Sequence, residues 1–482
     1  MKEYHKIISA LQVAVPAEGV KEAVYFIGIG GIGMSALARY FVSLGVSVSG
    51  YDKTPTALTR QLATEGISIH FEDNPALVDQ AAQLVVYTPA VPNDHKELIY
   101  CRENNLKIVK RSDVLGAITL SSFNICVAGT HGKTTTSTMV GHLLRHTGYG
   151  ANAFLGGISV NYNSNFWSSS NEVCVVEADE YDRSFLKLSP DIAIISSMDA
   201  DHLDIYGTAE HMEQAFIDFS ARLKPGGILI SKHGLAREAS LHGENRLTYH
   251  AEDQQANAFA FNTRMQDGSY LFDVVVKEPG KDEWVLKKVV LNMGGKHNIE
   301  NMIAAIIVAH SIGIGDEKIR EAVAAFRGVK RRFEYIIKNS HRVLIDDYAH
   351  HPEELRALIT GARALFPQKK CIVVFQPHLF SRTRDLADGF AEVLDLADEA
   401  ILLPIYPARE QPMEGVNSEM IIDRMHNENR MVMDKEKLLL HFQQELEAHV
   451  EEGYEGWMVI TAGAGDIDTL VAPLKELLTE KI

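Results

Sequence analysis

Short apolar runs alternate with amphipathic stretches in the first quarter of the chain. The runs VYFIGIG, VSVSGYD and QLVVYTP are typical of buried parallel strands, whereas SALARYFVSLG and the stretch through Leu58 and Leu62 have helical spacing. This order of strands and helices predicts a parallel sheet with right-handed crossovers. We therefore predict an N-terminal Rossmann-like domain over residues 1–121.

The pattern restarts at the strand-like run NICVAGT, near Ile125. Apolar residues at helical spacing follow between positions 139 and 144, and the strand-like runs VCVVEAD, IAIISSM and GILIS come after them. Residues 245–292 alternate in the manner of β-rich connecting structure. We predict a central domain over residues 122–330, built like a phosphate-loop ATPase.

A third restart begins beyond residue 330, with the strand-like runs RVLIDDY, KCIVVFQ, EAILLPIY and WMVITAG separated by helical stretches. It predicts a C-terminal Rossmann-like domain over residues 331–482. The predicted fold class is therefore α/β with three domains. Because ligands of open parallel sheets bind beyond the carboxyl ends of the strands, we expect the function to lie in clefts between domains.

Composition and charge narrow the choice of partner. Of the 482 residues, 46% are hydrophobic and 23% charged, as in soluble globular proteins, and the net charge of −17 disfavours general electrostatic binding to nucleic acid or anionic membranes. No apolar run reaches the roughly 18 to 20 residues of a membrane span, and the start MKEYHKIISALQ lacks the apolar core of a signal peptide. We expect a cytoplasmic protein without nucleic-acid partner or membrane insertion. Its four scattered cysteines are expected to be buried thiols.

A glycine-rich loop joins the first predicted strand and helix. Its glycines are Gly28, Gly30, Gly31 and Gly33, and Asp52 ends the next strand, 19 residues after Gly33. This spacing is typical of dinucleotide binding, in which main-chain N–H groups at a helix N-terminus meet a diphosphate. An NAD site, a site for another nucleotide diphosphate and a plain tight turn all fit this motif.

A second loop at a strand-to-helix junction has the composition of a phosphate loop. It consists of Gly129, Thr130, His131, Gly132, Lys133, Thr134 and Thr135. Main-chain N–H groups would cradle phosphates, Lys133 would neutralise the outer phosphates and the Thr134 hydroxyl would bind Mg²⁺. The usual pattern has a further glycine where this chain has Val127, so the loop is a shorter variant.

Acidic residues follow the next two predicted strands. They are Glu177, Asp179, Glu180 and Asp182 after the first, and Asp199, Asp201 and Asp204, with His202, after the second. A carboxylate at a strand end beside a phosphate loop suits Mg²⁺, which makes Glu177 a candidate ligand, whereas His202 alone is a weaker one. The alternative is a pair of capped, solvated strand ends.

Two further polar clusters precede the third domain. Asn298 and Asn301 are three residues apart and would share a helix face, where their amides suit a purine or ribose edge. The run Lys330-Arg331-Arg332 falls at the predicted domain boundary, where an arginine suits charge that develops on a transferred phosphoryl group. A solvated surface is the alternative for this run.

The third domain carries its own strand-end motifs, DDYAHHP and QPHLFSRT. Arg382 could bind a carboxylate through both guanidinium nitrogens, and His350 could contact an amine or an acid as a neutral imidazole. The residues alone leave His351 and His378 unassigned.

Eight strings in order resemble motifs of the Mur ligase family of bacterial cell-wall synthesis, over nearly the whole chain. They are GIGGIGMSALA, AGTHGKTTT, EADEYDRSFL, DADHLD, GKHNIEN, GVKRRFE, DDYAHHP and QPHLFSRTRD. The resemblance implies an ATP-dependent ligase that joins L-alanine to the lactyl carboxylate of UDP-N-acetylmuramate through an acyl phosphate, in peptidoglycan precursor synthesis. It further implies that the first domain binds UDP and not NAD, and that the protein is a monomer or weak homodimer.

The resemblance also implies residue roles. The implied catalytic residues are Lys133, Glu177, His202, Arg332 and His350. ATP is assigned to the loop from Gly129 to Thr135 with Asn298, Asn301 and Arg332, and Mg²⁺ to Thr134, Glu177 and His202. The substrate-binding residues are Gly28, Gly30, Gly31, Gly33, Asp52, His131, Tyr348, His350 and Arg382. Either His350 or bound phosphate would accept the proton of the L-alanine ammonium.

Two residues depart from the family pattern. Leu379 stands where many relatives have an arginine, and Ser197 where they often have an asparagine. Three rival functions stay open: a related ligase that recycles whole peptides onto the same sugar nucleotide, an NAD-dependent oxidoreductase, and a nucleotide-gated binding protein. The third-domain motifs favour the ligase for a single amino acid.

Overall fold

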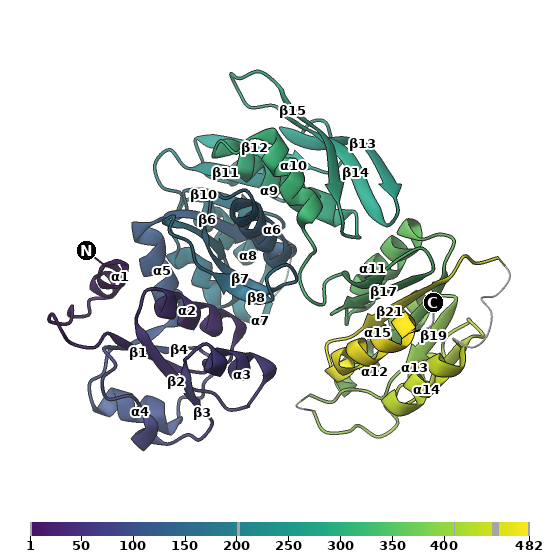
Figure 1. Cartoon of the computed structure of the whole chain (residues 1–482), viewed down its shortest axis with the longest axis horizontal. Coiled ribbons are helices and arrows are strands. Elements are labelled where there is room, and N and C mark those ends of the chain that lie inside the picture. The colour runs from purple at the N-terminus through teal and green to yellow at the C-terminus, as the bar shows by residue number, and fades with distance from the viewer. Residues whose placement is uncertain (1, 200–202, 409, 446–452, 481–482) are drawn as a thin grey trace. The chain divides into compact units, whose positions relative to one another are not determined.

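The computed structural model describes residues 2–199, 203–408, 410–445 and 453–480 (Figure 1). It contains sheets of five, ten and six strands, each accompanied by helices. The chain divides into two compact units: residues 1–261, 273–287 and 300–323 form the first, and residues 262–272, 288–299 and 324–482 form the second. The α/β class is confirmed, and the boundaries near residues 121 and 330 stay predictions.

The N-terminal sheet is fully parallel, with the strand order β3-β2-β1-β4-β5. Its strands are β1 (Ala23–Ile27), β2 (Ser47–Tyr51), β3 (Ser68–His70), β4 (Leu84–Tyr87) and β5 (Ile108–Lys110). Its helical segments are α1 (Glu3–Ala10), α2 (Ile32–Ser43), α3 (Ala57–Thr64), η1 (Pro75–Leu77), α4 (Lys96–Glu103) and α5 (Arg111–Ser121). Every residue of β1 is buried, as expected for a central strand with helices on both faces. The predicted Rossmann-like arrangement is confirmed.

The central sheet has the strand order β15-β14-β13-β12-β11-β10-β6-β9-β7-β8. Its first strands are β6 (Phe123–Ala128), β7 (Asn152–Ser159), β8 (Ser164–Trp167), β9 (Val173–Glu177), β10 (Ile192–Ile195) and β11 (Ile228–Lys232). The predicted β-rich segment supplies β12 (Asn245–His250), β13 (Ala258–Gln266), β14 (Ser269–Val276) and β15 (Trp284–Leu291). The helical segments are α6 (Lys133–His146), η2 (Tyr181–Lys187), α7 (Leu203–Tyr206), α8 (Ala209–Ser220), η3 (Glu238–Ser240), α9 (His297–Ser311) and α10 (Asp316–Ala325). Strands β11, β10, β6, β9 and β7 run parallel, so the loops after β6, β9 and β10 lie at one edge.

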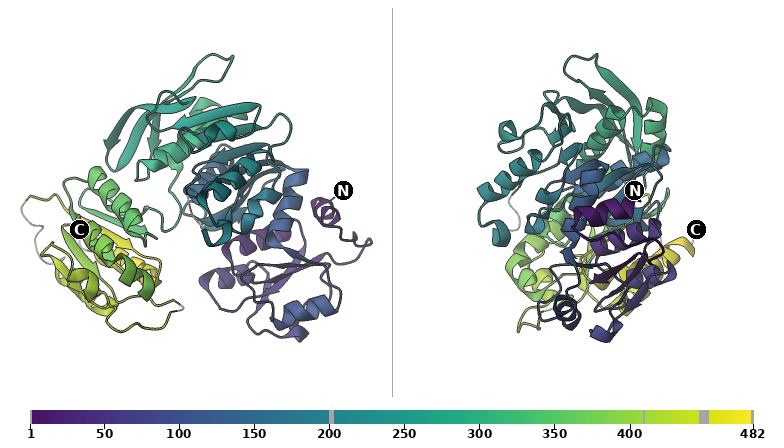
Figure 2. Two further views of the ribbon diagram at one scale, coloured as in Figure 1. Left: turned by 180° about the vertical axis from the view of Figure 1, so that it is seen from behind. Right: turned by 90° about the vertical axis from the view of Figure 1, so that its left-hand side faces the viewer.

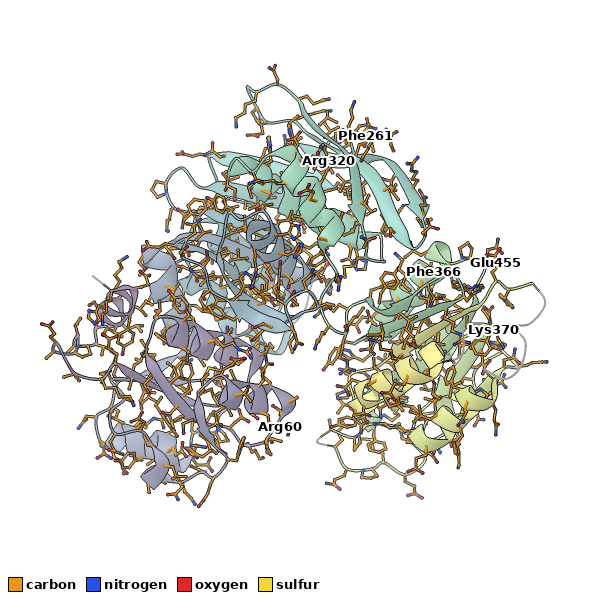
Figure 3. All side chains as sticks on the ribbon, viewed as in Figure 1. Arg60, Phe261, Arg320, Phe366, Lys370 and Glu455 are labelled. Carbon is orange, nitrogen blue, oxygen red and sulfur yellow. The ribbon has the colours of Figure 1, made fainter. Side chains whose placement is uncertain are left out.

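The third sheet has the strand order β16-β17-β21-β18-β19-β20, in which only the β16–β17 pair is antiparallel. Its strands are β16 (Glu334–Lys338), β17 (Arg342–Asp347), β18 (Lys370–Phe375), β19 (Glu399–Leu402), β20 (Arg430–Val432) and β21 (Trp457–Ala462). Its helical segments are α11 (Pro352–Leu365), α12 (Phe380–Leu394), α13 (Glu419–Ile422), α14 (Lys435–Glu445), η4 (Asp466–Leu470) and α15 (Val471–Glu480). Lys370 at the start of β18 is buried and pairs with Glu399 of β19, Nζ to Oε2, at 3.2 Å (Figure 3).

Side-chain alternation along β18 places helices on both faces of this sheet (Figure 2). Ile372 and Val374 share a core with residues of α14 and α15. Phe375 points the other way, and its ring centroid lies 5.1 Å from that of Phe390 on α12. The C-terminal sheet therefore has helices on both faces, as in the Rossmann-like domain that the sequence pattern predicts.

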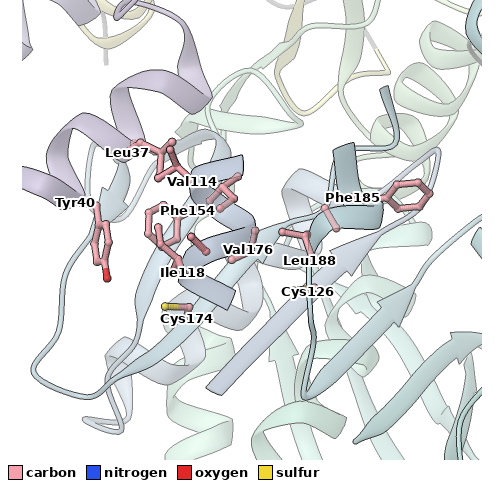
Figure 4. Packing of buried hydrophobic residues seen from close by; sticks show 14 of the residues in the cluster. Leu37, Tyr40, Val114, Ile118, Cys126, Phe154, Cys174, Val176, Phe185 and Leu188 are labelled. Carbon is pink, nitrogen blue, oxygen red and sulfur yellow. The ribbon is translucent and has the colours of Figure 1, made fainter. Parts of the chain in front are cut away.

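One hydrophobic core runs through both sheets of the first compact unit (Figure 4). Tyr40 of α2 makes edge-to-face contacts with Phe154 of β7 and Phe166 of β8, at centroid distances of 5.1 and 5.9 Å. Val114 and Ile118 of α5 belong to the same cluster. Aromatic pairs of this kind contribute about 0.5–1.5 kcal/mol each beyond their buried area, so this packing holds the first two sheets together.

The four cysteines Cys101, Cys126, Cys174 and Cys371 are buried and free, as predicted. Burial raises the pKa of each thiol, that of Cys101 to about 11, which keeps the thiols protonated at neutral pH. In the part of the chain that the structure describes, no helix has the length and apolar character needed to cross a membrane.

Candidate functional site

The glycine-rich loop lies between β1 and α2, at the carboxyl edge of the N-terminal sheet. A Cβ atom at Gly28, whose φ is +86°, would lie 2.9 Å from Thr88, and one at Gly30 would lie 2.7 Å from Asp52 Oδ2. The Gly30 N–H donates to that oxygen at 2.7 Å. Asp52, which sequence spacing assigns to the ligand, thus holds the loop in its shape.

A cavity of 290 Å³ connects the glycine-rich loop with the end of β9. It is lined by Gly31, Ile32, Gly33, Met34, Ala36, Thr88, Arg111, Leu115, Phe154, Leu155, Gly156, Glu177 and Asp179. All of these residues belong to the first compact unit. The cavity therefore brings a predicted diphosphate loop and a predicted metal ligand to one site.

Arg111 alone is a cation among the described residues that line this cavity. Its Nη2 lies 3.6 Å from Asp179 Oδ2, and its side chain packs close to Gly33. Sequence reasoning missed Arg111, although it is the first residue of α5, directly after β5, and so stands at a strand end like the predicted residues. Since the carboxylates of Glu177 and Asp179 line the same cavity, Arg111 is the group among these lining residues that can attract an anion.

The phosphate loop joins β6 to α6. Gly129 (φ +140°) and Gly132 (φ +82°) have backbone conformations that favour glycine, and an added Cβ at Gly132 would lie 2.8 Å from Asn301 Oδ1. Ser197 Oγ accepts from the His131 N–H at 2.7 Å and lies 2.8 Å from Thr130 Oγ1. The family departure at Ser197 therefore still supplies a polar contact that orders the loop.

Lys133 opens α6 and points back over the loop. Its Nζ donates to Gly129 O at 2.7 Å and to Glu180 Oε1 at 2.6 Å. The Glu180 side chain is fully buried, and burial raises the pKa of its carboxyl despite the neighbouring lysine. Glu180 was named in the sequence only as part of the acidic cluster, with no role of its own.

Glu177 ends β9 beside the start of α6. Its Oε1 accepts from Thr134 Oγ1 at 2.9 Å, and its Oε2 accepts from the Gly156 N–H at 2.9 Å. A carboxylate and a hydroxyl are the hard oxygen donors that Mg²⁺ prefers, so this pair fits the predicted metal. The third predicted ligand, His202, lies outside the described residues. Among all the residues that the structure describes, no cluster of three or more His, Cys, Asp or Glu could hold a metal.

The two predicted amides lie at the start of α9 and are buried, with 1% of Asn298 and 6% of Asn301 exposed. Asn298 Nδ2 donates to Gly294 O at 2.6 Å. Asn301 lies against Gly132 of the phosphate loop. The structure thus brings Asn301 to the phosphate loop, and it gives Asn298 a main-chain partner within its own unit.

The two arginines of the Lys-Arg-Arg run differ. Arg331 (φ +58°) donates to Gly463 O, and its guanidinium carbon lies 4.9 Å from the centre of the Tyr348 ring. Arg332 is exposed, and its charge partly offsets the burial that raises the pKa of Asp347 to about 6. Arg331 is therefore used to fold the second unit, and Arg332 is the arginine whose side chain is accessible.

Histidines and an arginine gather at the carboxyl edge of the third sheet. His350 Nδ1 lies 2.9 Å from Tyr348 O, and the His350 and His378 rings lie 6.2 Å apart. Neither His378 Nδ1 nor Arg382 Nη1, although both atoms are buried, has a hydrogen-bond partner in the described parts of the chain. Burial, with the nearby Arg382 and His350, lowers the pKa of His378, so its imidazole is neutral at pH 7. His378, which the sequence left unassigned, thus joins His350 and Arg382.

Neighbouring residues of this edge have structural roles or are solvent-exposed. His351 is the N-cap of α11 and accepts from the Glu353 N–H, at 3.4 Å. Leu379, the second family departure, precedes α12 with a φ of +70°. The Tyr348 side chain is exposed.

In the first unit, the side chain of His131 on the phosphate loop is also exposed.

Comparison with known proteins agrees with this arrangement. Three family models match in order: "Mur ligase family, catalytic domain" over residues 23–122, "Mur ligase middle domain" over 127–309 and "Mur ligase, glutamate ligase domain" over 331–465. The chain is 49% identical over 465 residues to the UDP-N-acetylmuramate–L-alanine ligase of Flavobacterium johnsoniae, covering 96% of this chain and 99% of that one. It is 47% identical over 462 residues to the corresponding ligase of Porphyromonas gingivalis, covering 94% and 98%.

Solved structures give the same result. The crystal structure of the UDP-N-acetylmuramate-alanine ligase of Thermotoga maritima matches with a TM-score of 0.76 and 28% identity, over 95% of this chain and 100% of that one. A murein peptide ligase from Psychrobacter arcticus matches with a TM-score of 0.62 and 21% identity, a likeness of fold alone. Three family models match in order along the chain, and relatives with 47–49% identity are matched over almost their whole length. The chain therefore belongs to the Mur ligase family.

Proposed function

We propose that this protein joins L-alanine to the lactyl carboxylate of UDP-N-acetylmuramate, converting ATP to ADP and phosphate and releasing UDP-N-acetylmuramoyl-L-alanine. The observation that carries the proposal is the cavity that runs from the glycine-rich loop to Glu177, beside the phosphate loop. A sugar nucleotide held there by its diphosphate would extend its carboxylate toward the phosphates of ATP. The curated relatives that share 47–49% of its sequence carry the name of this activity.

The first step makes the carboxylate reactive. A carboxylate is a poor acyl donor, so its oxygen attacks the outer phosphorus of ATP, ADP leaves, and an acyl phosphate forms. Negative charge accumulates on the phosphoryl group during this transfer, and the cations Lys133 and Arg332 are proposed to neutralise it. Asn298, Asn301 and the main-chain N–H groups of the loop are proposed to hold the nucleotide.

The metal proposal rests on the donor set. Thr134 and Glu177 are hard oxygen donors joined at 2.9 Å, and His202 is proposed as a third ligand by family resemblance. Mg²⁺ bound by them would lower the charge of the triphosphate. Glu177 also accepts from Gly156 and so is already oriented toward α6 without the metal.

For the sugar nucleotide, we propose that the loop of Gly28, Gly30, Gly31 and Gly33 binds the diphosphate. The N–H groups of Gly28 and Gly30 are bonded to Tyr51 O and Asp52 Oδ2, so these two glycines shape the loop, and the N–H groups of the first turn of α2, where Gly33 lies, are left for the diphosphate. Asp52 acts by fixing that loop through Gly30, and Arg111 supplies the positive charge. His131 is proposed to contact the substrate from the exposed side of the phosphate loop. These roles extend the diphosphate-loop interpretation of the sequence, with UDP, and not NAD, as the proposed ligand.

The second step forms the amide. Arg382 is proposed to bind the carboxylate of L-alanine, with Tyr348 and His350 nearby, and the neutral amine attacks the acyl carbon so that phosphate leaves. His350 Nδ1 faces a carbonyl, which can only accept, so Nδ1 carries the hydrogen and Nε2 is left as a proton acceptor. His350 is therefore proposed to take the ammonium proton, with bound phosphate as the alternative acceptor.

Phosphate release from ATP and Mg²⁺ tests the proposal. The purified protein would be given UDP-N-acetylmuramate with L-alanine, glycine, L-serine or L-Ala-γ-D-Glu-diaminopimelate in turn, and the product masses would be determined. Release that requires the sugar and L-alanine, with the mass of their condensation product, is expected. Release with the tripeptide alone would reassign the protein to peptide recycling, and uncoupled hydrolysis would make it a nucleotide-gated binding protein.

We propose that the reaction takes place in the cytoplasm, where ATP is available. We also propose that the protein is a monomer or a weak homodimer. Sedimentation velocity over a range of concentrations measures the oligomeric state.

A further inference from the structure

The phosphate-loop lysine shares its charge with a buried carboxylate that the proposed mechanism does not use. Lys133 Nζ and Glu180 Oε1 are 2.6 Å apart, with 15% of the Lys133 side chain and none of the Glu180 side chain exposed. A buried pair of this kind is weak evidence for stability, because desolvation of both ions offsets much of their attraction. The pair therefore calls for an explanation other than stability.

Glu180 is fixed by its main chain. Its carbonyl oxygen accepts from Tyr206 Oη at 2.6 Å and from the Arg183 N–H at 2.9 Å. It also lies three residues beyond Glu177, which is bonded to Thr134 and Gly156. The carboxylate thus stands at a set position relative to the loop.

Lys133 keeps one donor for a ligand. An ammonium group has three N–H bonds, and two of them are directed at Gly129 O and Glu180 Oε1. These two acceptors fix where the third points. The negative charge of Glu180 also repels any phosphate near Lys133, and this repulsion offsets part of the attraction that Lys133 exerts. Such repulsion is larger in an interior of low dielectric constant than at a surface.

We propose that Glu180 is a positioning residue that orients Lys133 through its carboxylate oxygen and limits the affinity of the loop for nucleotide phosphates through its charge. This limit on affinity would help the enzyme to release its product, because ADP carries the same α- and β-phosphates as ATP. The inference rests on the proposed ATP site, and it adds a residue to which the family motifs gave no role.

Glu180→Gln separates charge from geometry, because glutamine keeps an oxygen acceptor of the same reach. Affinities for ATP, ADP, inorganic tripolyphosphate and adenosine would be measured by calorimetry on the full chain, without sugar or amino acid. We expect the variant to bind the three phosphate ligands about three- to tenfold more tightly, the size expected for one screened charge near the phosphates, and adenosine unchanged. Glu172→Gln removes an exposed carboxylate just before β9 and should match wild type throughout.

Glu180→Asp makes the complementary change, because it keeps the charge and shortens the reach. Its KM for ATP should stay within about twofold of wild type, while kcat falls about tenfold because Lys133 is misdirected. This split of kcat from KM also serves as the test if the glutamine variant does not fold.

The outcomes separate the inference from the proposed function. Unchanged or weaker binding of tripolyphosphate by folded Glu180→Gln, or unchanged kcat in Glu180→Asp, would overturn the role of Glu180. A lower melting temperature with wild-type constants would make the pair merely structural. Failure of the wild-type protein itself to bind ATP would instead overturn the nucleotide site.

Discussion

At the scale of single residues, the site places its few cations where anionic substrates must bind. The chain as a whole carries a net charge of −17, so distant charges repel ATP and a sugar diphosphate alike. Arg111 in the cavity and Lys133 on the phosphate loop oppose that repulsion locally. Arg111 pairs with Asp179 and Lys133 pairs with Glu180, and both acids belong to the short segment after β9. We therefore expect individual charge pairs, more than the net charge of the chain, to set the affinity for substrates.

Arg111→Ala should weaken binding of the sugar nucleotide and leave ATP binding nearly unchanged, because Arg111 is the cation of the cavity next to the glycine-rich loop. We expect KM for UDP-N-acetylmuramate to rise about tenfold or more, the loss of one charge-assisted hydrogen bond, with KM for ATP within twofold. Steady-state kinetics with each substrate varied in turn measures both values. Arg102→Ala, an exposed arginine of α4, is the matched control. Equal rises in both KM values would contradict a role specific to the sugar.

At the scale of elements, a buried polar network joins α2 to the β7–β8 hairpin. Asn165 of β8 is fully buried, donates to Ile32 O at 2.5 Å and to Ser35 Oγ at 3.0 Å, and accepts from Arg39. Arg39 in turn makes two bonds to Glu65, at 2.7 and 2.9 Å. The contacts reach the first turn of α2, so the same network supports the helix that follows the glycine-rich loop.

Asn165→Ala should destabilise the first unit, because one nitrogen of the buried Arg39 would lose its acceptor, whereas Ile32 O would keep its bond from Ser35 Oγ, at 2.9 Å. The expected loss is about 1 to 3 kcal/mol in the free energy of unfolding, from one unsatisfied buried group. Urea denaturation followed by circular dichroism measures it. Asn104→Ala, at an exposed helix end, should cost less than about 1 kcal/mol. A loss at Asn165 no larger than at Asn104 would show that water satisfies the network.

Strand β17 carries two acids whose burial makes stability depend on pH. Burial raises the pKa of Asp346 to about 7 and that of Asp347 to about 6, although Thr461 Oγ1 donates to Asp346 and the nearby Arg331 is cationic. The folded state thus keeps protons that the unfolded state releases above about pH 4. By linkage, the free energy of unfolding should fall as the pH rises from about 4 to about 7 and then level off.

Asp346→Asn should remove part of that fall, because asparagine has no proton to lose. Between pH 5 and pH 8 we expect the free energy of unfolding to fall by about 1 to 3 kcal/mol less in the variant than in wild type. The fall that is due to Asp347, which occurs below about pH 6, should remain. Denaturation at a series of pH values compares the slopes. Asp423→Asn, an exposed acid of the same unit, should keep the wild-type slope. Parallel curves for wild type and Asp346→Asn would contradict the assignment.

At the scale of the whole molecule, the sequence predicts what depends on local order and misses what depends on distant contacts. The strand runs and the loops after β1, β6 and β9 could be predicted, because periodicity and glycine spacing are local and parallel strands bring their ends to one edge. The role of Asn165 could not, since its partner Arg39 is 126 residues away. The Lys133–Glu180 pair spans 47 residues, and in the sequence Glu180 is one acid among several.

The proposed residues divide by the reaction step that they serve, and not strictly by compact unit. The cavity and the phosphate loop belong to the first unit, whereas His350, His378 and Arg382 belong to the second, as does Arg332, which is proposed for the first step. The amine plays no part until the acyl phosphate exists. Residues that bind the amino acid should therefore matter for the second step alone, and residues that stabilise phosphoryl transfer for the first.

Arg382→Ala tests this division. In a single turnover with ATP, Mg²⁺ and UDP-N-acetylmuramate but no amino acid, the variant should form ADP and acyl phosphate as wild type does, because no group of the first step has changed. With L-alanine, its KM should rise at least about tenfold, since Arg382 is proposed to bind the carboxylate and its Nη1 has no other partner in the described residues. Arg332→Ala should do the reverse and suppress the ADP burst, because its charge is proposed to act on the transferred phosphoryl group. Rapid-quench measurement of ADP, with hydroxylamine trapping of the acyl phosphate, distinguishes the two. A lost burst in Arg382→Ala would mean that Arg382 itself acts on the first step, and would contradict its assignment to the second.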